Sequence, residues 1–541
     1  MVYYMPTGKK EEKTMLPKRK KETICLLLYC AAAAFFILLF ATRSSFLYPC
    51  NDWNDANSYF SMGKALFNGR VPYRDIFDQK GMYLYFFYGL AYLVSHTTFA
   101  GVFLLELILA VFDLAAIIKI LRLYVKKSAS LILAPLALAA GFSSQSFYWG
   151  GSAEEVCLPF LLWGFYLSLR YFRQDYPERE MGKGTVFAGG LLAGMVANIK
   201  FTSLGLFFAW MMCVAFAFLA KRNLKGALGA CGIFLTGMAL PFVPWAVYFA
   251  VNGALYDWYW GYVYINVFAY SNLNSEGPSL SERVYTLSKL LYWVARKNSG
   301  YFVFVIPGVL AELLGKGRSL LARFHIFALC FFLFLGIYVG GSELPYYALP
   351  LFVFAPLGFA YLGRAAQSLF ARRGQRRERS APFGMKSAKT AGGRLALAGG
   401  CAACLLVSAA FVAATSMNTP FLSEKREDIF LYKFREIVRQ REDPTLLNIG
   451  CLDAGLYTVC DIVPTCRWFQ TQTINMDLVY QEQESYVREG RTDFVLARDG
   501  YPDVIFEKYE LAGEEKWSMG EQEFTYYLFE KKETTGKAGL K

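Results

Sequence analysis

The sequence alternates between long apolar runs and short polar segments. A run of about 20 apolar residues is long enough to cross a bilayer as an α-helix. The run near 185–220 carries polar NIKFTS at its middle, so two short spans with a turn at Lys200 fit it better than one. With that division, the runs predict about eleven transmembrane helices. The runs lie near residues 23–42, 99–121, 129–147, 156–172, 185–220, 227–251, 301–315, 324–341, 346–363 and 395–415.

Composition also indicates a membrane protein. Hydrophobic residues make up 55% of the 541 residues, and the mean hydropathy is +0.30. The first run follows the basic stretch KKEEKTMLPKRKKE and is longer than the apolar part of a cleaved signal peptide, so we expect a retained first span after a basic N-terminus, residues 1–22. The net charge of +13 comes from short Lys and Arg clusters between apolar runs. The positive-inside rule explains such clusters, so we expect no nucleic-acid partner.

A further apolar segment, residues 81–97, decides the orientation of every later helix. If it does not cross, 30 Lys and Arg residues fall on the side of the N-terminus, against 10 on the other side before residue 416. If it crosses, most of those 30 move to the opposite side, which violates the positive-inside rule. We therefore predict that 81–97 is an interfacial helix on the outer leaflet, with the N-terminus inside and the C-terminus outside.

This topology divides the chain into a transmembrane domain, 23–415, and an extracytoplasmic tail, 416–541. Within the first part it predicts an outer loop at 43–98 that carries interfacial helices, and a second outer loop at 252–299. Residues 364–394 form a basic cytoplasmic linker whose expected contact is anionic lipid.

The tail has the composition of a small α/β domain. SEKREDIFLYKFREIVRQRED has helical periodicity, TLLNIG and DFVLA are apolar runs of strand length, and EFTYYLFEKK alternates as a strand does. Cys451, Cys460 and Cys466 leave two possibilities open. They hold a disulfide, as an oxidising compartment permits, or they remain free or buried thiols.

The outer loop carries an unusual concentration of charge between two apolar segments. Asp52 and Asp55 precede NSYFSMGKALFNG, whose apolar spacing predicts a short amphipathic helix with Asp55 at its N-cap. PYRDIFDQK then brings Arg74 and Lys80 back towards the membrane. A solvated loop and a helix cap are the plain alternatives. A carboxylate and cations at headgroup level would also suit a reaction on a lipid phosphate, because the acid accepts a proton and the cations stabilise a departing phosphate.

These residues resemble a known family. Asp55, Tyr59, Gly69 and PYRDIFDQKG with Lys80 are similar to the first outer loop of GT-C glycosyltransferases of the aminoarabinose-transferase and protein O-mannosyltransferase type, in particular their bacterial cell-surface relatives. The resemblance covers roughly residues 20–415. It includes the interfacial helix, the acidic loop GGSAEEVCLPF, the lysine in GLLAGMVANIKFTSLG and the late motif PYYALP.

The resemblance implies transfer of a monosaccharide from a polyprenyl-phosphate carrier, with inversion. It gives Asp55 the role of general base for the acceptor hydroxyl. The acid that often follows in the family is Ala56 here, and Asp52 is the alternate base. No Walker-type or GxGxxG phosphate loop stands on a strand and helix in this sequence, which agrees with a lipid-linked donor rather than a nucleotide sugar.

The resemblance also assigns binding roles. Lys80 matches the lysine that binds the carrier phosphate; Arg74 and Lys200 are candidates to assist it, although snorkelling to the interface would also explain Lys200. Residues in the second outer loop and in the late loop are expected to orient the acceptor or the loop. These residues are Glu154, Glu155, Glu343, Tyr346 and Tyr347. The alternative for the acids of the second outer loop is a solvated loop tip, and the alternative for the tyrosines of the late loop is an aromatic belt at the membrane interface.

Metal chemistry has little support in the sequence. His96 and His325 are the two histidines and fall in different regions, so no His-based metal cluster is expected. No cofactor is assigned, and a divalent cation held by carboxylates stays open.

The apolar runs predict a polytopic membrane protein, and the resemblance implies a GT-C-like glycosyltransferase of a bacterial plasma membrane. The expected acceptor is an extracytoplasmic glycan, a teichoic-acid-like polymer, a lipid or a protein, met at the outer face. The alternative is a transporter or flippase of lipid-linked sugars. Transporters tend to place ionisable groups near the bilayer midplane, often in repeated halves. Here the informative charges cluster at the outer interface, although Glu106 and Asp113 lie within the second span.

Overall fold

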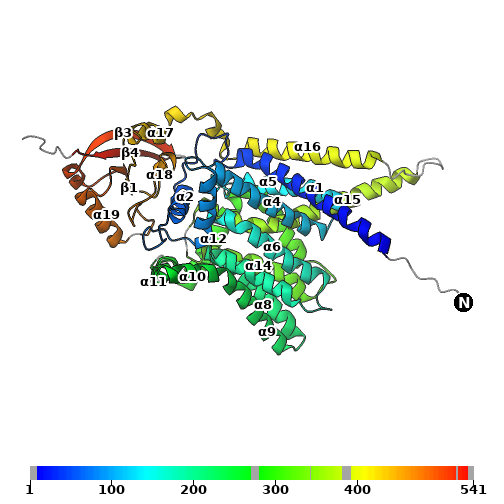
Figure 1. Cartoon of the computed structure of the whole chain (residues 1–541). Helices are drawn as coiled ribbons and strands as arrows, with labels where there is room; N and C mark the ends of the chain where they lie inside the picture. Colours follow the sequence, from blue (N-terminus) through cyan, green and yellow to red (C-terminus); the bar gives the residue numbers. More distant parts are fainter. Residues whose placement is uncertain are drawn as a thin grey trace, which may run out of the picture.

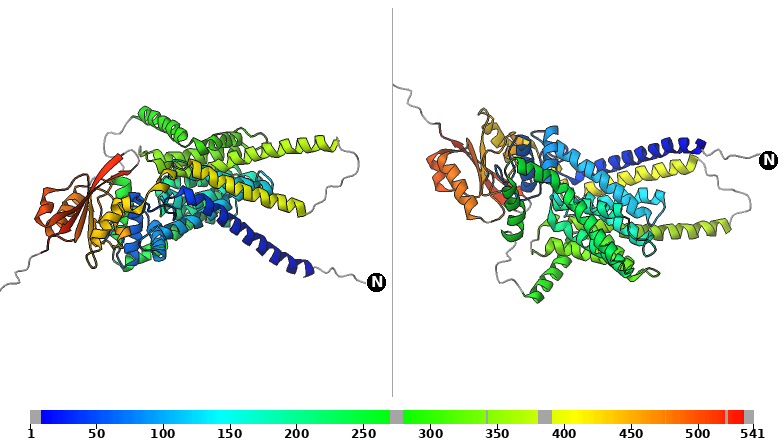
Figure 2. Two further views of the ribbon diagram at one scale, coloured as in Figure 1. Left: turned by 90° about the horizontal axis from the view of Figure 1, so that it is seen from above. Right: turned by 60° about the horizontal axis from the view of Figure 1, so that its bottom comes forward.

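The computed structural model describes residues 9–269, 279–340, 343–379, 391–474, 476–519 and 522–533. It consists of a helical bundle and a small α/β unit that packs on one end of the bundle (Figure 1). The N-terminal part of α1 and the facing ends of α15 and α16 lie at the other end, and two further views agree (Figure 2). The basic N-terminus and the tail therefore stand at opposite ends of the bundle.

Each apolar run of the sequence falls on one or more helices of the bundle. Among the described residues, seven helical segments are long and apolar enough to cross a membrane. The segments of the chain that contain them are α1 (Lys9–Ala41), α4 (Ala100–Arg122), η1 with α8 (Phe201–Leu204, Gly205–Ala220), α9 with η2 and α10 (Leu224–Ala239, Leu240–Phe242, Val243–Val251), α14 (Leu320–Tyr338), η4 with α15 (Pro345–Phe354, Ala355–Arg379) and α16 (Ala391–Thr415). The chain is thus a multi-pass membrane protein, and the number of eleven spans stays a prediction.

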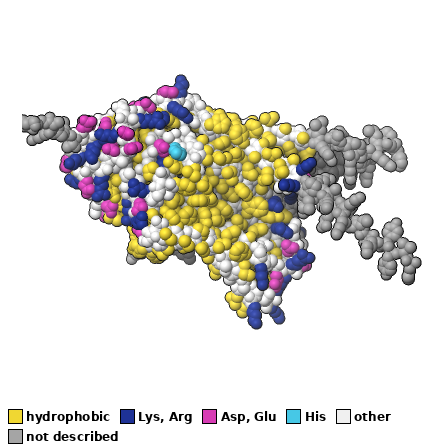
Figure 3. Space-filling model, viewed as in Figure 1, with side chains coloured by type: hydrophobic (Ala, Val, Ile, Leu, Met, Phe, Trp, Pro, Cys, Tyr) yellow, Lys and Arg dark blue, Asp and Glu magenta, His cyan; other side chains and the backbone are white. Residues whose placement is uncertain are grey.

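Shorter helices complete the bundle. Three of the predicted spans, α5 (Lys127–Phe142), α7 (Lys183–Ala197) and α13 (Ser299–Leu313), are apolar but shorter than 18 residues. The run near 156–172 is α6 (Ala153–Gln174). Figure 3 shows the result on one face, where apolar side chains cover the bundle between two charged ends. Such a band is what a bilayer requires of a helical membrane protein.

The break predicted at Lys200 is present. α7 ends at Ala197, the 3₁₀ turn η1 (Phe201–Leu204) follows, and α8 begins at Gly205. The carbonyls of the break are used by another segment: Gly81 N donates to Ile199 O at 3.1 Å and Tyr83 N donates to Asn198 O at 3.2 Å. A Cβ at Gly81 would lie 2.2 Å from Asn198 O, so this approach requires glycine.

The outer loop folds as a helical hairpin of α2 (Asn54–Phe67) and α3 (Met82–Val94). The two helices approach closely, because a Cβ at Gly63 would lie 2.4 Å from Gly89 N. At 1.5 Å per residue α3 is about 20 Å long, against a hydrocarbon core of about 30 Å. Its length fits the interfacial helix that the sequence predicts at 81–97.

The start of α2 differs from the sequence prediction. The N-cap is Trp53, which makes no side-chain capping bond, and Asp55 lies in the first turn of the helix. The expectation that Asp55 caps α2 is wrong, because its carboxylate accepts hydrogen bonds from tyrosine side chains instead of backbone N–H groups.

The second outer loop contains more structure than the sequence indicated. α11 (Leu255–Trp258) continues into a π-helix, η3 (Tyr259–Ala269), and α12 (Leu280–Lys297) begins with a capping box of Ser279 and Glu282. Gly261 of η3 packs on the Tyr73 ring, where a Cβ would lie 2.5 Å away. Residues 270–278 of the predicted loop and 380–390 of the predicted linker lie outside the described residues.

The tail forms a four-stranded sheet of order β1-β2-β4-β3, in which β1 and β2 are parallel and the other pairs antiparallel. The three predicted strands are confirmed, whereas β3 and α19 were not foreseen. All twelve cysteines are free, including the three of the tail. The extracytoplasmic location and the domain boundaries stay predictions. The elements are α17 (Phe430–Val438), β1 (Leu446–Ile449), α18 (Leu456–Val459), α19 (Asp477–Glu489), β2 (Phe494–Arg498), η7 (Asp503–Glu507), β3 (Tyr509–Met519) and β4 (Gln522–Lys531).

The tail docks on α2 through buried polar contacts. Ser61 Oγ donates to Asp453 Oδ2 at 2.5 Å. The fully buried Lys64 pairs with Asp461 at 3.0 Å and donates to Tyr457 O at 3.0 Å. Because unpartnered buried charges are costly, these pairs fix the tail against the outer loop.

Tail docking should weaken as pH rises, because burial raises the pKa of Asp453 to about 6. An unfolded aspartate ionises near pH 4, so the buried carboxyl opposes folding by roughly 2 to 3 kcal/mol once pH passes 6. Asp453→Asn removes this titration. We expect the melting temperature of the wild type to fall relative to Asp453→Asn between about pH 4 and 6 and to run parallel above. Parallel melting curves throughout would contradict this origin of the pH dependence.

Candidate functional site

Asp55 lies at the centre of a buried polar cluster between the outer loop and the late loop. Tyr346 Oη donates to Asp55 Oδ2 at 2.8 Å, and Tyr59 Oη lies 3.3 Å from the same oxygen. Tyr346 comes from η4 (Pro345–Phe354), which begins with the PYYALP motif. The described residues give Asp55 Oδ1 no hydrogen-bond donor. One carboxylate oxygen is thus held by tyrosines and the other is open to accept a proton.

Lys200 joins this cluster from the break between α7 and α8. Its Nζ forms a short ion pair with Glu154 Oε1 and lies 4.0 Å from the centre of the Tyr347 ring. Glu154 is buried at the start of α6, and its Oε2 has no partner among the described residues. The reading of Glu154 as a solvated loop tip is wrong, since the acid neutralises Lys200 inside the protein.

A cavity of about 200 Å³ lies beside the cluster. Lys80, Lys200 and Tyr347 line it, together with Gln79, Tyr262 and Asn266. Within the described part of the chain, Lys80 Nζ has no hydrogen-bond or ion-pair partner, and Gln79 Oε1 is buried without one. The cavity therefore offers two cations, one already paired, a free amide oxygen and aromatic faces. A phosphorylated sugar could use all of these.

Asp78 belongs to the cluster, and the sequence analysis missed it. It is buried and accepts a hydrogen bond from Tyr85 Oη at 2.8 Å. Burial raises the pKa of Asp78, the Lys80 cation opposes the rise, and the Asp55 charge adds to it. Asp78 lies two residues before Lys80 in PYRDIFDQKG, so its place in this motif could have identified it as a candidate site residue.

Asp52 has a structural position instead. It pairs with Arg43 at 2.8 Å and accepts a hydrogen bond from Trp517 Nε1 of the tail at 2.9 Å. Both charged side chains are buried, and Arg43 also pairs with Glu424 at 2.8 Å. Asp52 thereby links the end of the first helix to the tail rather than joining the Asp55 cluster.

Three other candidates lie apart from the cavity. Arg74 is 41% exposed and pairs with its neighbour Asp75. Glu343 pairs with Lys297 at 3.0 Å on the surface. Glu155 is buried like Glu154, so a solvated tip is wrong for it as well, but it accepts a hydrogen bond from Gly151 N at 2.8 Å on the side of Glu106. The structure thus brings together Asp55, Lys80, Lys200, Glu154, Tyr346 and Tyr347.

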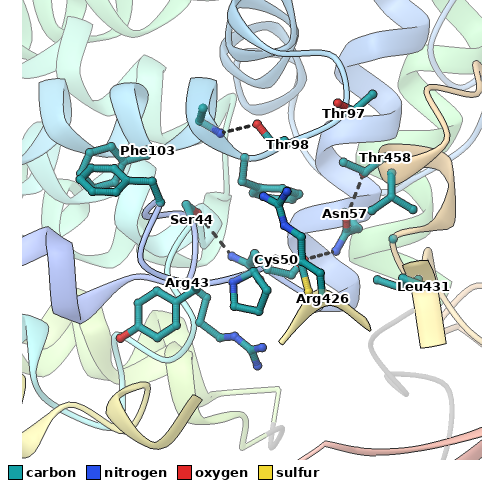
Figure 4. Close-up of a pocket in the computed structure, with 18 of the residues that line it drawn as sticks. Arg43, Ser44, Cys50, Asn57, Thr97, Thr98, Phe103, Arg426, Leu431 and Thr458 are labelled. Atoms are coloured by element: carbon teal, nitrogen blue, oxygen red, sulfur yellow. Dashed lines mark hydrogen bonds between the residues drawn. The ribbon is translucent and has the colours of Figure 1, made fainter. Parts of the chain in front are cut away.

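A second hollow of about 150 Å³ lies where the tail meets the outer loop (Figure 4). Polar side chains line it from four segments: Arg43 and Ser44 from the loop after α1, Asn57 from α2, Thr97 and Thr98 from the turn after α3, and Arg426 from the tail. It shares no lining residue with the Lys80 cavity. Its hydroxyl, amide and guanidinium groups suit a polar, uncharged or anionic ligand.

Metal ligation finds no support in the part of the chain that the structure describes. No group of three or more His, Cys, Asp or Glu side chains there is placed to hold an ion. A divalent cation stays an untested possibility of the sequence.

The fold has counterparts among solved structures. It is similar to crystal structures of ArnT from Cupriavidus metallidurans, both bound to undecaprenyl phosphate and in the apo state. Each has a TM-score of 0.59 and 12% sequence identity, covering 93% and 94% of this chain and 98% of ArnT. Archaeal oligosaccharyltransferase AglB from Archaeoglobus fulgidus, in complex with an inhibitory peptide and a dolichol-phosphate, gives a TM-score of 0.44 at 12% identity, over 88% of this chain and 69% of AglB. No protein-family model and no curated protein matches the sequence.

Asp52→Ala should destabilise the protein, because it leaves the Arg43 guanidinium buried without one of its two carboxylates. Removing one partner of a buried ion pair costs about 3 kcal/mol. We expect a lower melting temperature and faster proteolytic release of the tail. Glu515→Ala is the matched control, since its pair with Lys433 is partly exposed and worth about 0 to 1 kcal/mol. Equal melting of both variants would show that the buried pair does not hold the tail.

Proposed function

We propose that the protein is a membrane glycosyltransferase that moves a monosaccharide from a polyprenyl-phosphate carrier to an extracytoplasmic acceptor. The observation that carries this proposal is one cluster that joins an open carboxylate oxygen on Asp55 to a cavity lined by Lys80, whose Nζ has no partner among the described residues. A proton acceptor and a phosphate-binding cation are the two groups that such a transfer requires.

The carrier phosphate would lie in the cavity between Lys80 and Lys200. Lys80 is free to pair with it, whereas Lys200 already neutralises Glu154 and would contribute a second, shared cation. ArnT, which shares the fold, has been crystallised with undecaprenyl phosphate, and this supports a carrier of the same class. The sugar would then extend towards Asp55 along the Tyr346 and Tyr347 rings.

The reaction follows from this placement. Asp55 accepts the proton of the acceptor hydroxyl while the oxygen of that hydroxyl attacks the anomeric carbon of the sugar. The bond from that carbon to the phosphate oxygen breaks, and the electron pair leaves with the polyprenyl phosphate, which the lysines stabilise. Attack from the face opposite the phosphate inverts the anomeric carbon. Tyr59 and Tyr346 hold the Asp55 carboxylate in place for the attack.

The acceptor and the cellular setting are proposed from the resemblance. A cell-surface glycan, a teichoic-acid-like polymer, a lipid or a protein at the outer face of a bacterial plasma membrane would meet the cavity from the end that carries the tail. The hollow between the tail and the outer loop lies on that end as well, since tail residues line it.

Movement of lipid-linked sugars across the bilayer is the second candidate. Glu106 and Asp113 favour it, because both are buried within α4 and neither Asp113 oxygen has a partner among the described residues. Buried acids within a span are typical of transport pathways. Against it, the open carboxylate and the free lysine both stand at one end of the bundle.

Asp55→Asn should abolish transfer while sparing the binding of the donor. In lipid-reconstituted protein supplied with a panel of polyprenyl-phosphate sugars, we expect turnover to fall by about 10²-fold or more, because the amide cannot take the proton. Donor affinity should change little, since Asp55 does not line the phosphate cavity. Glu343→Gln, at a surface carboxylate outside the cluster, is the matched control and should keep wild-type turnover.

Either of two results would contradict the proposal. Full turnover in Asp55→Asn would remove the proposed base. Absence of transfer with every donor, together with movement of the carrier between leaflets, would replace the enzyme with a flippase.

A further inference from the structure

A third cavity, also polar, lies at the end of the bundle remote from the tail. It has a volume of about 470 Å³ and is lined by Arg173, Lys316, Arg318, Tyr361 and Arg364. These residues come from the end of α6, the turn after α13, and α15. Figure 3 shows Lys and Arg side chains gathered along this end of the apolar band.

A buried carboxylate organises this cavity. Glu312 is fully buried and accepts hydrogen bonds from Arg318 at 2.5 Å, Tyr361 at 2.6 Å and Tyr124 at 2.7 Å. Arg173 lies 3.4 Å from the same carboxylate and stacks on the Tyr124 ring at 3.8 Å. The two guanidinium groups are therefore held in fixed positions before any ligand arrives.

The cavity holds more positive charge than the protein neutralises. Four cationic side chains line it, and Glu312 pairs with two of them, Arg173 and Arg318. Within the described residues, Lys316 and Arg364 have no carboxylate partner; Arg364 lies 5.7 Å from the centre of the Tyr361 ring. Oriented guanidinium groups and free cations favour an anion with several oxygens, above all a phosphate.

The surroundings of the cavity are apolar. Leu310, Leu314, Leu320 and Leu362 flank it in sequence and are between 47% and 71% exposed. Free phosphate would bury none of this apolar surface, whereas the acyl chains of a lipid would cover it. Basic pockets between membrane helices are known sites for anionic headgroups.

We propose that this cavity binds the phosphate headgroup of an anionic phospholipid in the leaflet at that end of the bundle. The headgroup would pair with Lys316 and Arg364, while the Glu312 network presents Arg318 and Arg173 to the same phosphate. The bound lipid would hold together the ends of α6, α13 and α15. The site is remote from the Asp55 cluster, and the inference does not depend on the proposed function.

The test is lipid binding to the purified full-length protein in detergent, measured by native mass spectrometry. Phosphatidylglycerol and cardiolipin should bind the wild type about tenfold or more tightly than phosphatidylcholine. In the double variant Lys316→Ala, Arg364→Ala, that preference should disappear. Neither side chain bonds to Glu312, so the variant keeps the network intact, and each single substitution should lose part of the preference. Lys225→Ala, an exposed lysine at the start of α9, is the matched control.

Two outcomes would overturn the inference. An unchanged preference for anionic lipid in the double variant would place lipid binding elsewhere. If inorganic phosphate alone raises the melting temperature of the wild type as much as the lipids do, and displaces them, the cavity is a site for free phosphate rather than for a lipid.

Discussion

The structure depends on how the charges of the outer loop are neutralised once they are buried. Bringing an ion out of water costs several kcal/mol unless a partner compensates it. Arg43 is compensated by Asp52 and Glu424, and Lys64 by Asp461 of the tail. These pairs join the outer loop, including α2, to the tail. Among the described residues, Lys80 Nζ of the same loop has no hydrogen-bond or ion-pair partner, so it is left able to pair with an anion.

A backbone contact places Lys80 beside Lys200. The break after α7 exposes the carbonyls of Asn198 and Ile199, and the start of α3 satisfies them through its own N–H groups. Gly81 permits this approach, and the residues next to the contact, Lys80 on one side and Lys200 on the other, line one cavity. The break in the apolar run therefore lines one side of this cavity, and the residues just before α3 line another. The Asp55 carboxylate meets this site through Tyr346 of the late loop.

Much of the fold could be predicted from the sequence because it depends on local patterns: apolar runs long enough to cross a bilayer, and the apolar or alternating runs of strands. The apolar runs, the break at Lys200 and three strands of the tail are of this kind. The sequence could not predict pairings between distant segments. The sequence favoured Asp55 over Asp52 as the base, but it could not show that Trp517, 465 residues after Asp52, bonds to Asp52 whereas Tyr346 bonds to Asp55. The sequence did not predict β3, α12 and α19, because their apolar patterns are short or mixed, and it did not single out Asp78. The burial of Glu154 and Glu155 depends on tertiary packing, which the local sequence does not show.

The most direct test of this account is equilibrium binding of undecaprenyl phosphate to the purified full-length protein. The account predicts that Lys80→Ala weakens binding by about tenfold or more, because the cavity loses its unpaired cation. Arg74→Ala removes a cation from the same loop that is already paired with Asp75 outside the cavity, and it should bind as the wild type does. Equal affinity of Lys80→Ala and the wild type for undecaprenyl phosphate would contradict the claim that Lys80 binds the carrier phosphate.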